Sequence, residues 1–194
     1  MITAKKLMVL LSLIFIVSCS RTSTDPSEVI KNIYSGTEGL AMRFMPGAPA
    51  ENVYEKGPFT VNLELENKGA YDIKDATLSL ALEEDYMMVS SWLTEDLSII
   101  DESKARFSIK GRSQQEPNPG KKVISLKVDA LSIKEQMSEK HESNIIATAC
   151  YIYQTNVIQT VCIDTDPHNL VEKEKVCEVE DITLSGQGAP VAAV

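Results

Sequence analysis

Hydrophobic and polar residues alternate most regularly between residues 59 and 82 of the chain. Two alternating runs lie in this stretch, one over residues 59–65 and the other over residues 76–82. Because successive side chains of a β-strand point to opposite faces, a period of two predicts two strands with one face in a core and the other in water. Asn67 and Gly69 lie between the runs, in a combination typical of a turn. The stretch therefore predicts a strand, a turn and a strand of an antiparallel all-β domain.

Further alternating runs at residues 40–45, 106–110 and 124–130 predict more strands, of which 124–130 is the most regular. Residues 83–100 alternate less regularly, and we expect them to cross between two sheets. Residues 111–120 and 134–143 are rich in proline, glycine or charge and predict loops. Amphipathic helices of the kind that connect parallel strands do not interrupt these runs, which favours a two-sheet sandwich over a parallel α/β fold. We expect the sandwich to occupy residues 37–185 and to end in a hairpin, with residues 186–194 as a tail.

The N-terminal residues predict export. Lys5 and Lys6 precede an uninterrupted apolar run over residues 7–17, which fits a secretory signal and is too short to span a bilayer. Aliphatic and small residues then lead into Cys19, which resembles the acylated cysteine of a lipoprotein; the alternative is an ordinary signal peptide in which Cys19 is incidental. We expect a signal peptide at residues 1–18, lipidation of Cys19, and a tether at residues 19–36 with a short helix that ends at Gly36.

Composition and charge narrow the class of partner. The chain is 43% hydrophobic and 24% charged, as is usual for a globular protein, and its formal net charge is −9. An acidic surface disfavours binding to nucleic acid and electrostatic docking on anionic lipid. The expected contact with the membrane is therefore the lipid anchor alone, on the outer face of the cell membrane.

The remaining cysteines are compatible with an oxidising compartment. Cys150 and Cys162 are equally distant from Asn156, so a symmetric hairpin about that residue would place them opposite each other. This favours a Cys150–Cys162 disulfide, and the competing pair is Cys162 with Cys177. Either pairing leaves one of these three thiols unpaired or available to another chain.

The segment VNLELENKGAYDIKDATLSL, residues 61–80, resembles the CARDB and S-layer-associated class of immunoglobulin-like domains. Residues 36–59 and the late segment LSGQGAPVA are similar to a group of poorly characterised archaeal envelope lipoproteins. The resemblance covers residues 36–82 and 176–192. It implies an exported immunoglobulin-like sandwich used for adhesion, spacing or surface architecture, with no catalytic residues to carry over.

Residues with catalytic or ligand-binding chemistry are sparse. The sequence contains no G-x-S-x-G, H-E-x-x-H or phosphate-binding glycine loop, so we expect no enzyme and no cofactor. Asp164 and Asp166 form part of an acidic turn that lacks the ligand series of a calcium loop. Tyr86, Met88 and Trp92 are the best candidates for an apolar pocket, although packing in the core explains Trp92 better than contact with a ligand does.

Two functions remain open on this basis. The first is a non-catalytic, lipid-anchored interaction module that contacts an envelope protein or glycan. The second is a ligand-binding accessory lipoprotein of a transporter or extracellular enzyme. The apolar end of the tail fits either a fragment of a longer protein or a strand added to a partner's sheet.

Overall fold

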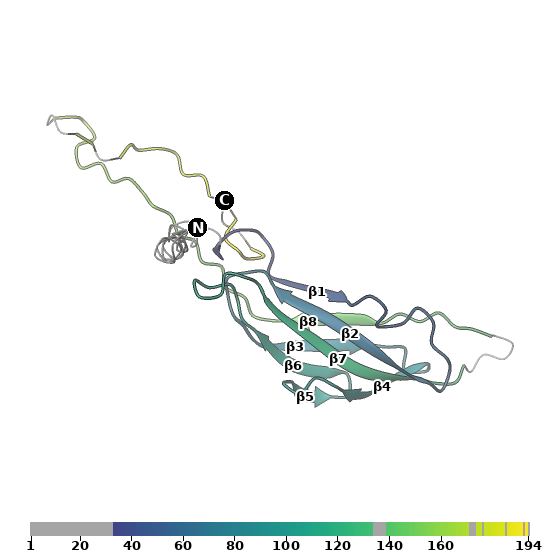
Figure 1. Ribbon diagram of the computed structural model, residues 1–194. Helices are drawn as coiled ribbons and strands as arrows, with labels where there is room; N and C mark the ends of the chain where they lie inside the picture. The colour runs from purple at the N-terminus through teal and green to yellow at the C-terminus, as the bar shows by residue number, and fades with distance from the viewer. Residues whose placement is uncertain are drawn as a thin grey trace, which may run out of the picture.

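The computed structural model is an all-β structure with two antiparallel sheets (Figure 1). It describes residues 33–133, 139–170, 174, 175, 177–184, 186–191 and 193. The first sheet, called the β2 sheet, has the order β1-β2-β7-β4, and the second, called the β3 sheet, has the order β5-β6-β3-β8. Their bounds are β1 Leu40–Phe44, β2 Pro58–Asn67, β3 Ile73–Ala81, β4 Met87–Trp92, β5 Ser98–Asp101, β6 Lys104–Ile109, β7 Gly120–Ala130 and β8 Ile146–Cys150.

The core lies between the two sheets and is made by the alternating apolar positions of their strands. Burial alternates residue by residue along β2, β3, β6 and β7, as expected for strands that have one face in a core and one in water. The innermost side chains, which are fully buried, are Val61, Leu63, Leu65, Ile73, Leu78, Ile124, Leu126 and Val128. This packing confirms the prediction of an all-β chain with two antiparallel sheets.

The two most regular strands do not pair with each other. β2 pairs with β1 and β7, whereas β3 pairs with β6 and β8. The turn between β2 and β3 therefore carries the chain from one sheet to the other, and the two apolar rows face each other across the core. The irregular stretch at residues 83–100 also crosses between sheets, as predicted, because it holds β4 of the β2 sheet and β5 of the β3 sheet.

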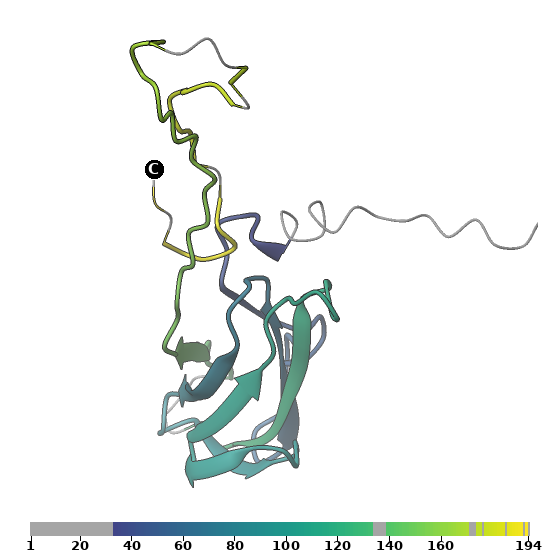
Figure 2. The ribbon, with the colours of Figure 1, turned by 90° about the vertical axis from the view of Figure 1, so that its left-hand side faces the viewer.

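Beyond β8 the chain leaves the sandwich as a long projection, which we call the arm (Figures 1 and 2). Residues 151–165 run outward, a turn follows at residues 166–169, and the later residues return to the sandwich. The predicted hairpin about Asn156 is not formed, because no strand follows Cys150 among the described residues and the chain turns only at residues 166–169.

The returning chain docks on the sandwich through Gly188. Its N–H donates to the carbonyl of Gly36 (2.8 Å), and its own carbonyl accepts hydrogen bonds from the N–H of Ala70 (3.0 Å) and the hydroxyl of Tyr153 (3.2 Å). Gly188 has a φ of 65°, a backbone conformation that glycine adopts at little cost. The base of the arm is therefore held on three separate segments of the chain.

The predicted signal peptide at residues 1–18, the lipidation site Cys19 and the tether helix before residue 33 lie outside the described residues. Among the residues that are described, no helix is long and apolar enough to cross a membrane.

Candidate functional site

A cavity lies at the end of the sandwich opposite the arm. It has a volume of about 1070 Å³ and is enclosed by the loop at residues 49–55, the start of β4 and the segment at residues 139–145, which leads into β8. Tyr86 forms part of its wall. The ring of Tyr86 stacks on the imidazole of His141 with 3.7 Å between ring centroids. The cavity therefore presents an aromatic surface close to polar groups.

Glu83 connects the polar groups beside this cavity. One carboxylate oxygen, Oε2, accepts a hydrogen bond from the hydroxyl of Ser143 and lies within hydrogen-bond distance of Nε2 of His141, each at 2.9 Å. The hydrogen bond with His141, followed by the one from Ser143, lowers the pKa of the Glu83 carboxyl. A serine nucleophile needs the imidazole between hydroxyl and acid, whereas here the acid lies between the other two groups. The arrangement orders the segment before β8 and does not activate Ser143.

The structure separates the three residues of the predicted pocket. Tyr86 lines the cavity, but Met88 is 46% exposed on the outer face of β4, and its neighbour Met87 packs in the core instead. Trp92 lies at the other end of β4, half-buried against the core, and its indole N–H donates to the carbonyl of Glu102 (3.1 Å). Tyr86 precedes β4, and Met88 points outward from it. The register shift between Val89 and Ser91 brings Trp92 to the core side of the strand, so the three predicted residues do not line one pocket.

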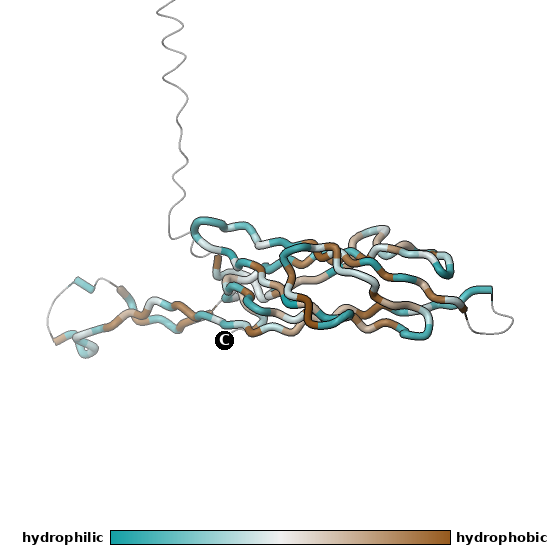
Figure 3. The backbone as a smooth tube through the Cα atoms, turned by 90° about the horizontal axis from the view of Figure 1, so that it is seen from below, coloured by the Kyte–Doolittle hydropathy of each residue, from teal (hydrophilic) through white to brown (hydrophobic). Residues whose placement is uncertain are grey.

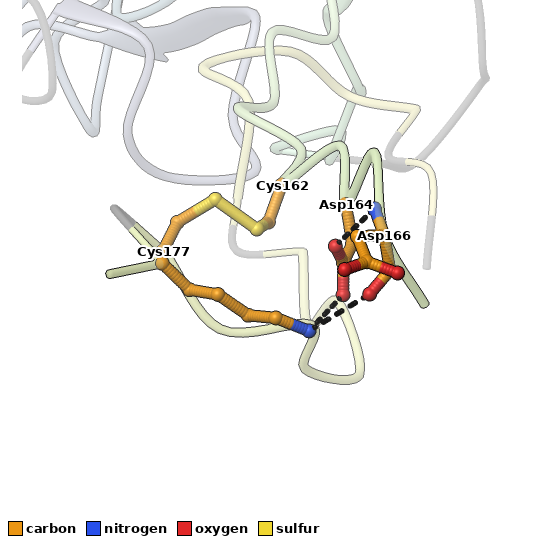
Figure 4. The surroundings of a disulfide bond; sticks show 5 residues. Cys162, Asp164, Asp166 and Cys177 are labelled. Atoms are coloured by element: carbon orange, nitrogen blue, oxygen red, sulfur yellow. Dashed lines mark hydrogen bonds and ion pairs between the residues drawn. A yellow bond between two sulfur atoms is a disulfide. The ribbon is translucent and has the colours of Figure 1, made fainter. Parts of the chain in front are cut away.

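The disulfide joins Cys162 to Cys177, with 5.9 Å between their Cα atoms, and Cys150 is a free, exposed thiol (Figure 4). The predicted Cys150–Cys162 pairing is therefore wrong. It assumed a turn at Asn156, whereas the chain continues outward past that residue and turns only near Asn169. Cys162 precedes Asn169 by as many residues as Cys177 follows Leu170, so the later turn places this pair opposite each other.

The acidic turn next to the disulfide is held by its own side chains (Figure 4). The ammonium group of Lys175 lies 2.6 Å from a carboxylate oxygen of Asp164, and this contact is the main cause of the lowered pKa of Asp164. The other oxygen of Asp164 accepts from the N–H of Asp166 (2.9 Å), and a carboxylate oxygen of Asp166 accepts from the N–H of Leu170 (2.9 Å). The carboxylates thus bind backbone and lysine, and no group of three or more metal-ligating side chains occurs among the described residues.

Large apolar side chains are exposed along the arm. Brown, hydrophobic segments follow its two chains in Figure 3. Leu170 at the turn is 83% exposed and Ile163 is 78% exposed. The exposed set comprises Ile152, Val157, Ile158, Val161, Ile163, Leu170, Val179, Ile182 and Val191. A concentration of exposed apolar residues on one element marks a surface that binds another molecule or promotes aggregation.

The backbone of the arm also lacks internal pairing. No hydrogen bond between backbone groups joins the outgoing residues 151–165 to the described residues of the returning chain. The two chains are joined by the disulfide, the Asp164–Lys175 ion pair and hydrogen bonds from the hydroxyls of Tyr153 and Thr155 to the carbonyls of Gly188 and Val191. Extended segments with unpaired N–H and C=O groups can pair with the edge of another β-sheet. The arm therefore has the features of a docking element in its side chains and in its backbone.

Asn67 and Gly69 lie beneath the base of the arm. Asn67 is fully buried, donates from Nδ2 to the carbonyl of Tyr71 (2.8 Å) and accepts at Oδ1 from the N–H of Gly69 (3.2 Å). A side chain at Gly69 would collide with the hydroxyl of Tyr153. These contacts agree with the turn predicted at Asn67 and Gly69. They also show that the base of the arm packs against this turn.

Sequence reasoning missed Tyr151 and Tyr153, which hold the arm against the sandwich. Their rings pack edge to face with 5.9 Å between centroids, and both contact the core. The hydroxyl of Tyr151 accepts from the N–H of Leu40 (3.3 Å), and burial raises the pKa of Tyr153. The signal was present, because the alternation of Ala147 and Ala149 continues into these tyrosines.

No protein-family model matches this chain, and the search of curated proteins found no match.

Proposed function

We propose that this chain is an exported, lipid-anchored, non-catalytic module that binds another component of the cell envelope through its arm. The arm carries the proposal, because it combines exposed apolar side chains with unpaired extended backbone on a covalently closed scaffold. A protein is the favoured partner over a glycan, since a second polypeptide can satisfy both the apolar surface and the backbone groups.

The sandwich is the support from which the arm projects, and we assign it to the immunoglobulin-like class. In favour of this assignment, successive strands β2 and β3 lie in opposite sheets, and β8 returns to pair with β3. The resemblance of residues 61–80 to CARDB domains agrees with it. Export is supported by the charged and apolar N-terminal residues and by the disulfide, which is typical of oxidising compartments.

The binding proposal is tested with a variant that changes only exposed side chains of the arm. The double variant Ile158→Ser with Ile163→Ser should bind at least ten-fold more weakly than the wild type to isolated envelopes from cells that lack the gene. Ile99→Ser is the matched control, because Ile99 is an exposed isoleucine on β5 of the sandwich. Equal binding by the wild type and the arm variant would refute the proposal.

The anchor is tested separately. Cys19→Ser should release the protein from the membrane fraction while leaving its circular dichroism unchanged. Membrane association that survives this substitution would rule out lipidation of Cys19 as the anchor.

A second candidate function is ligand binding at the cavity beside Tyr86, as in an accessory lipoprotein of a transporter or extracellular enzyme. The stacked Tyr86 and His141 rings favour it. A solute that raises the melting temperature of the wild type but not of Tyr86→Ala would support this function. If no solute in a panel of sugars, amino acids and organic ions has that effect, the cavity is not a ligand site.

A further inference from the structure

The outer face of the β3 sheet has a basic strand at its centre. Lys104, Arg106 and Lys110 alternate with buried residues along and just after β6, so all three project outward. Lys104 and Lys110 form ion pairs with Asp101 and Asp72 at 3.3 Å each, whereas Arg106 forms no ion pair with any described residue. This face is therefore a place where an overall acidic chain presents accessible positive charge.

Small side chains lie next to the basic strand. The register pairs Arg106 with Thr77 and pairs Thr77 with Cys150 on β8. It likewise pairs Lys104 with Ser79 of β3. At the end of the face where β8 leads into the arm, a hollow of about 500 Å³ is lined by Asp72, Lys74, Asp75, Cys150 and Ile152, together with Tyr71 and Tyr151. A shallow strip therefore runs along β3, between long cationic side chains on one side and uncharged ones on the other.

The outer face of the β2 sheet differs in its charge. On that face Arg43 forms an ion pair with Glu64 (2.6 Å), and Lys121 forms one with Glu66 (3.3 Å). Both acids belong to β2, so a central strand of this face carries negative charge, whereas the central strand β6 of the other face carries Lys104 and Arg106. The β3 sheet thus offers the better surface for an acidic partner.

The arm carries acidic side chains that complement the cations on the outer face of the β3 sheet. Its outgoing chain carries exposed isoleucines and valines, and its returning chain carries the exposed acids Glu174, Glu178, Glu180 and Asp181. The outgoing residues 151–165, at about 3.3 Å per residue, span about 50 Å, which exceeds the length of a strand of the sandwich. The arm is therefore long enough to cover a complete sheet face.

We propose that the arm of one copy of this chain lies across the outer face of the β3 sheet of a second copy. The acids of the returning chain face Lys104 and Arg106, and the apolar outgoing chain lies over Thr77, Ser79 and β8. This inference rests on the proposed binding function of the arm and specifies its partner. Because the arm and the acceptor face are different surfaces, each added copy leaves one of each free, and assembly continues as an open chain.

Sedimentation velocity of the Cys19→Ser protein tests the assembly without a lipid anchor. The weight-average mass should exceed that of a dimer at about 200 μM in 50 mM NaCl. Raising NaCl to 500 mM should weaken association at least five-fold, because salt screens contacts between exposed charges. A mass that stays monomeric under the low-salt condition would overturn the inference.

Two half-defective variants make the test specific. Lys104→Glu with Arg106→Glu removes the acceptor face, and Glu178→Lys with Glu180→Lys removes the acidic side of the arm. Each should be monomeric alone, and a 1:1 mixture should assemble into an open chain in which the two variants alternate, because the reversed arm of one variant matches the reversed face of the other. Combining all four substitutions in one chain should restore open assembly, which also shows that the variants fold. Lys127→Glu, on the outer face of the β2 sheet, should assemble like the parent protein.

The outcomes separate this inference from the proposed function. Half-defective variants that self-assemble like the parent protein, or a mixture that does not assemble, would overturn the head-to-tail contact. If the parent protein stays monomeric while Ile158→Ser with Ile163→Ser still loses envelope binding, the arm binds a different protein, and only the inference of a second copy fails.

Discussion

Replacing Asn67 with alanine should destabilise the protein substantially, although Asn67 belongs to a turn. The side chain is fully buried at the end of β2 and makes two hydrogen bonds to the backbone of residues 69 and 71. Alanine makes neither, so the N–H of Gly69 and the carbonyl of Tyr71 lose these partners. A buried polar group left without a partner costs about 1–3 kcal/mol. Because the hydrogen bond from Asn67 to the carbonyl of Tyr71 is only partly buried, we expect the free energy of unfolding to fall by about 2–4 kcal/mol.

Urea unfolding followed by fluorescence of the single tryptophan measures this loss. Trp92 is half-buried against the core, so its emission should change on unfolding. With a slope of about 2 kcal/mol per molar urea, the middle of the usual range for small proteins, the midpoint should fall by about 1–2 M. Such a loss is a large part of the free energy of unfolding of a typical domain, which is about 5–15 kcal/mol.

Lys68→Ala is the matched control, because it changes the neighbouring residue without touching the buried network. Lys68 forms an exposed ion pair with Glu38 (2.9 Å), and loss of exposed ion pairs has little effect on stability. Its unfolding midpoint should therefore match that of the wild type. If Asn67→Ala has the same midpoint as Lys68→Ala, the two hydrogen bonds do not stabilise the fold and the reasoning fails.

Three further predictions concern the sandwich and the base and closure of the arm. The pKa of Asp72 is lowered chiefly by the hydrogen bond from the N–H of Gly111 (2.8 Å). The Asp72 carboxylate therefore stabilises the folded state at pH values above its unfolded pKa of about 3.9. This stabilisation is lost as the pH falls through the lower pKa of the folded state. The urea midpoints of the wild type and Asp72→Asn should differ at pH 7 and converge in acid; a gap that persists at about pH 2.5 would contradict this cause. Non-reducing peptide mapping should recover Cys162 and Cys177 in one linked species, and any other pairing would refute the assigned closure. Gly188→Ala should lower the melting temperature and speed hydrogen exchange at the base of the arm. The reason is that Gly188 has a φ of 65° and a Cβ there would lie 2.8 Å from the carbonyl oxygen of Ile33. An unchanged melting temperature would show that the base of the arm tolerates a side chain.

Periodicity predicted the sandwich because its strands bury one face each. The alternation in residues 59–65 and 124–130 reflects a core that accepts every second side chain, and the structure places these residues in β2 and β7. Which strands pair could not be predicted from that signal, since β2 and β3 would show the same pattern in a hairpin or in opposite sheets.

In the arm, the alternation of hydrophobic and polar residues no longer predicts the structure. Alternation continues from β8 through Tyr151 and Tyr153, but beyond them both faces are in solvent, and a period of two no longer reports a core. The polar residues near Asn156 then resembled a turn, and the disulfide was assigned to Cys150 and Cys162. The true turn has the stronger signal, since Asp166 is followed by proline and Asn169 adopts a φ of 51°.

The candidate site was predicted only in part, for a related reason. Tyr86, Met88 and Trp92 are spaced to share one face of a regular strand, but Tyr86 precedes β4 and the bulge within β4 places Met88 and Trp92 on opposite faces. The partners of Tyr86 at the cavity, His141 and Glu83, come from segments that only the folded chain brings together.

The disulfide also determines what a protease can do to the arm. Exposed turns are the preferred sites of proteolytic cleavage, and the turn of the arm lies between Cys162 and Cys177. A single cut between these cysteines would leave both fragments covalently joined, while each remains attached to the sandwich through its own part of the arm base. A single cut at the turn of the arm therefore removes no residue from the protein.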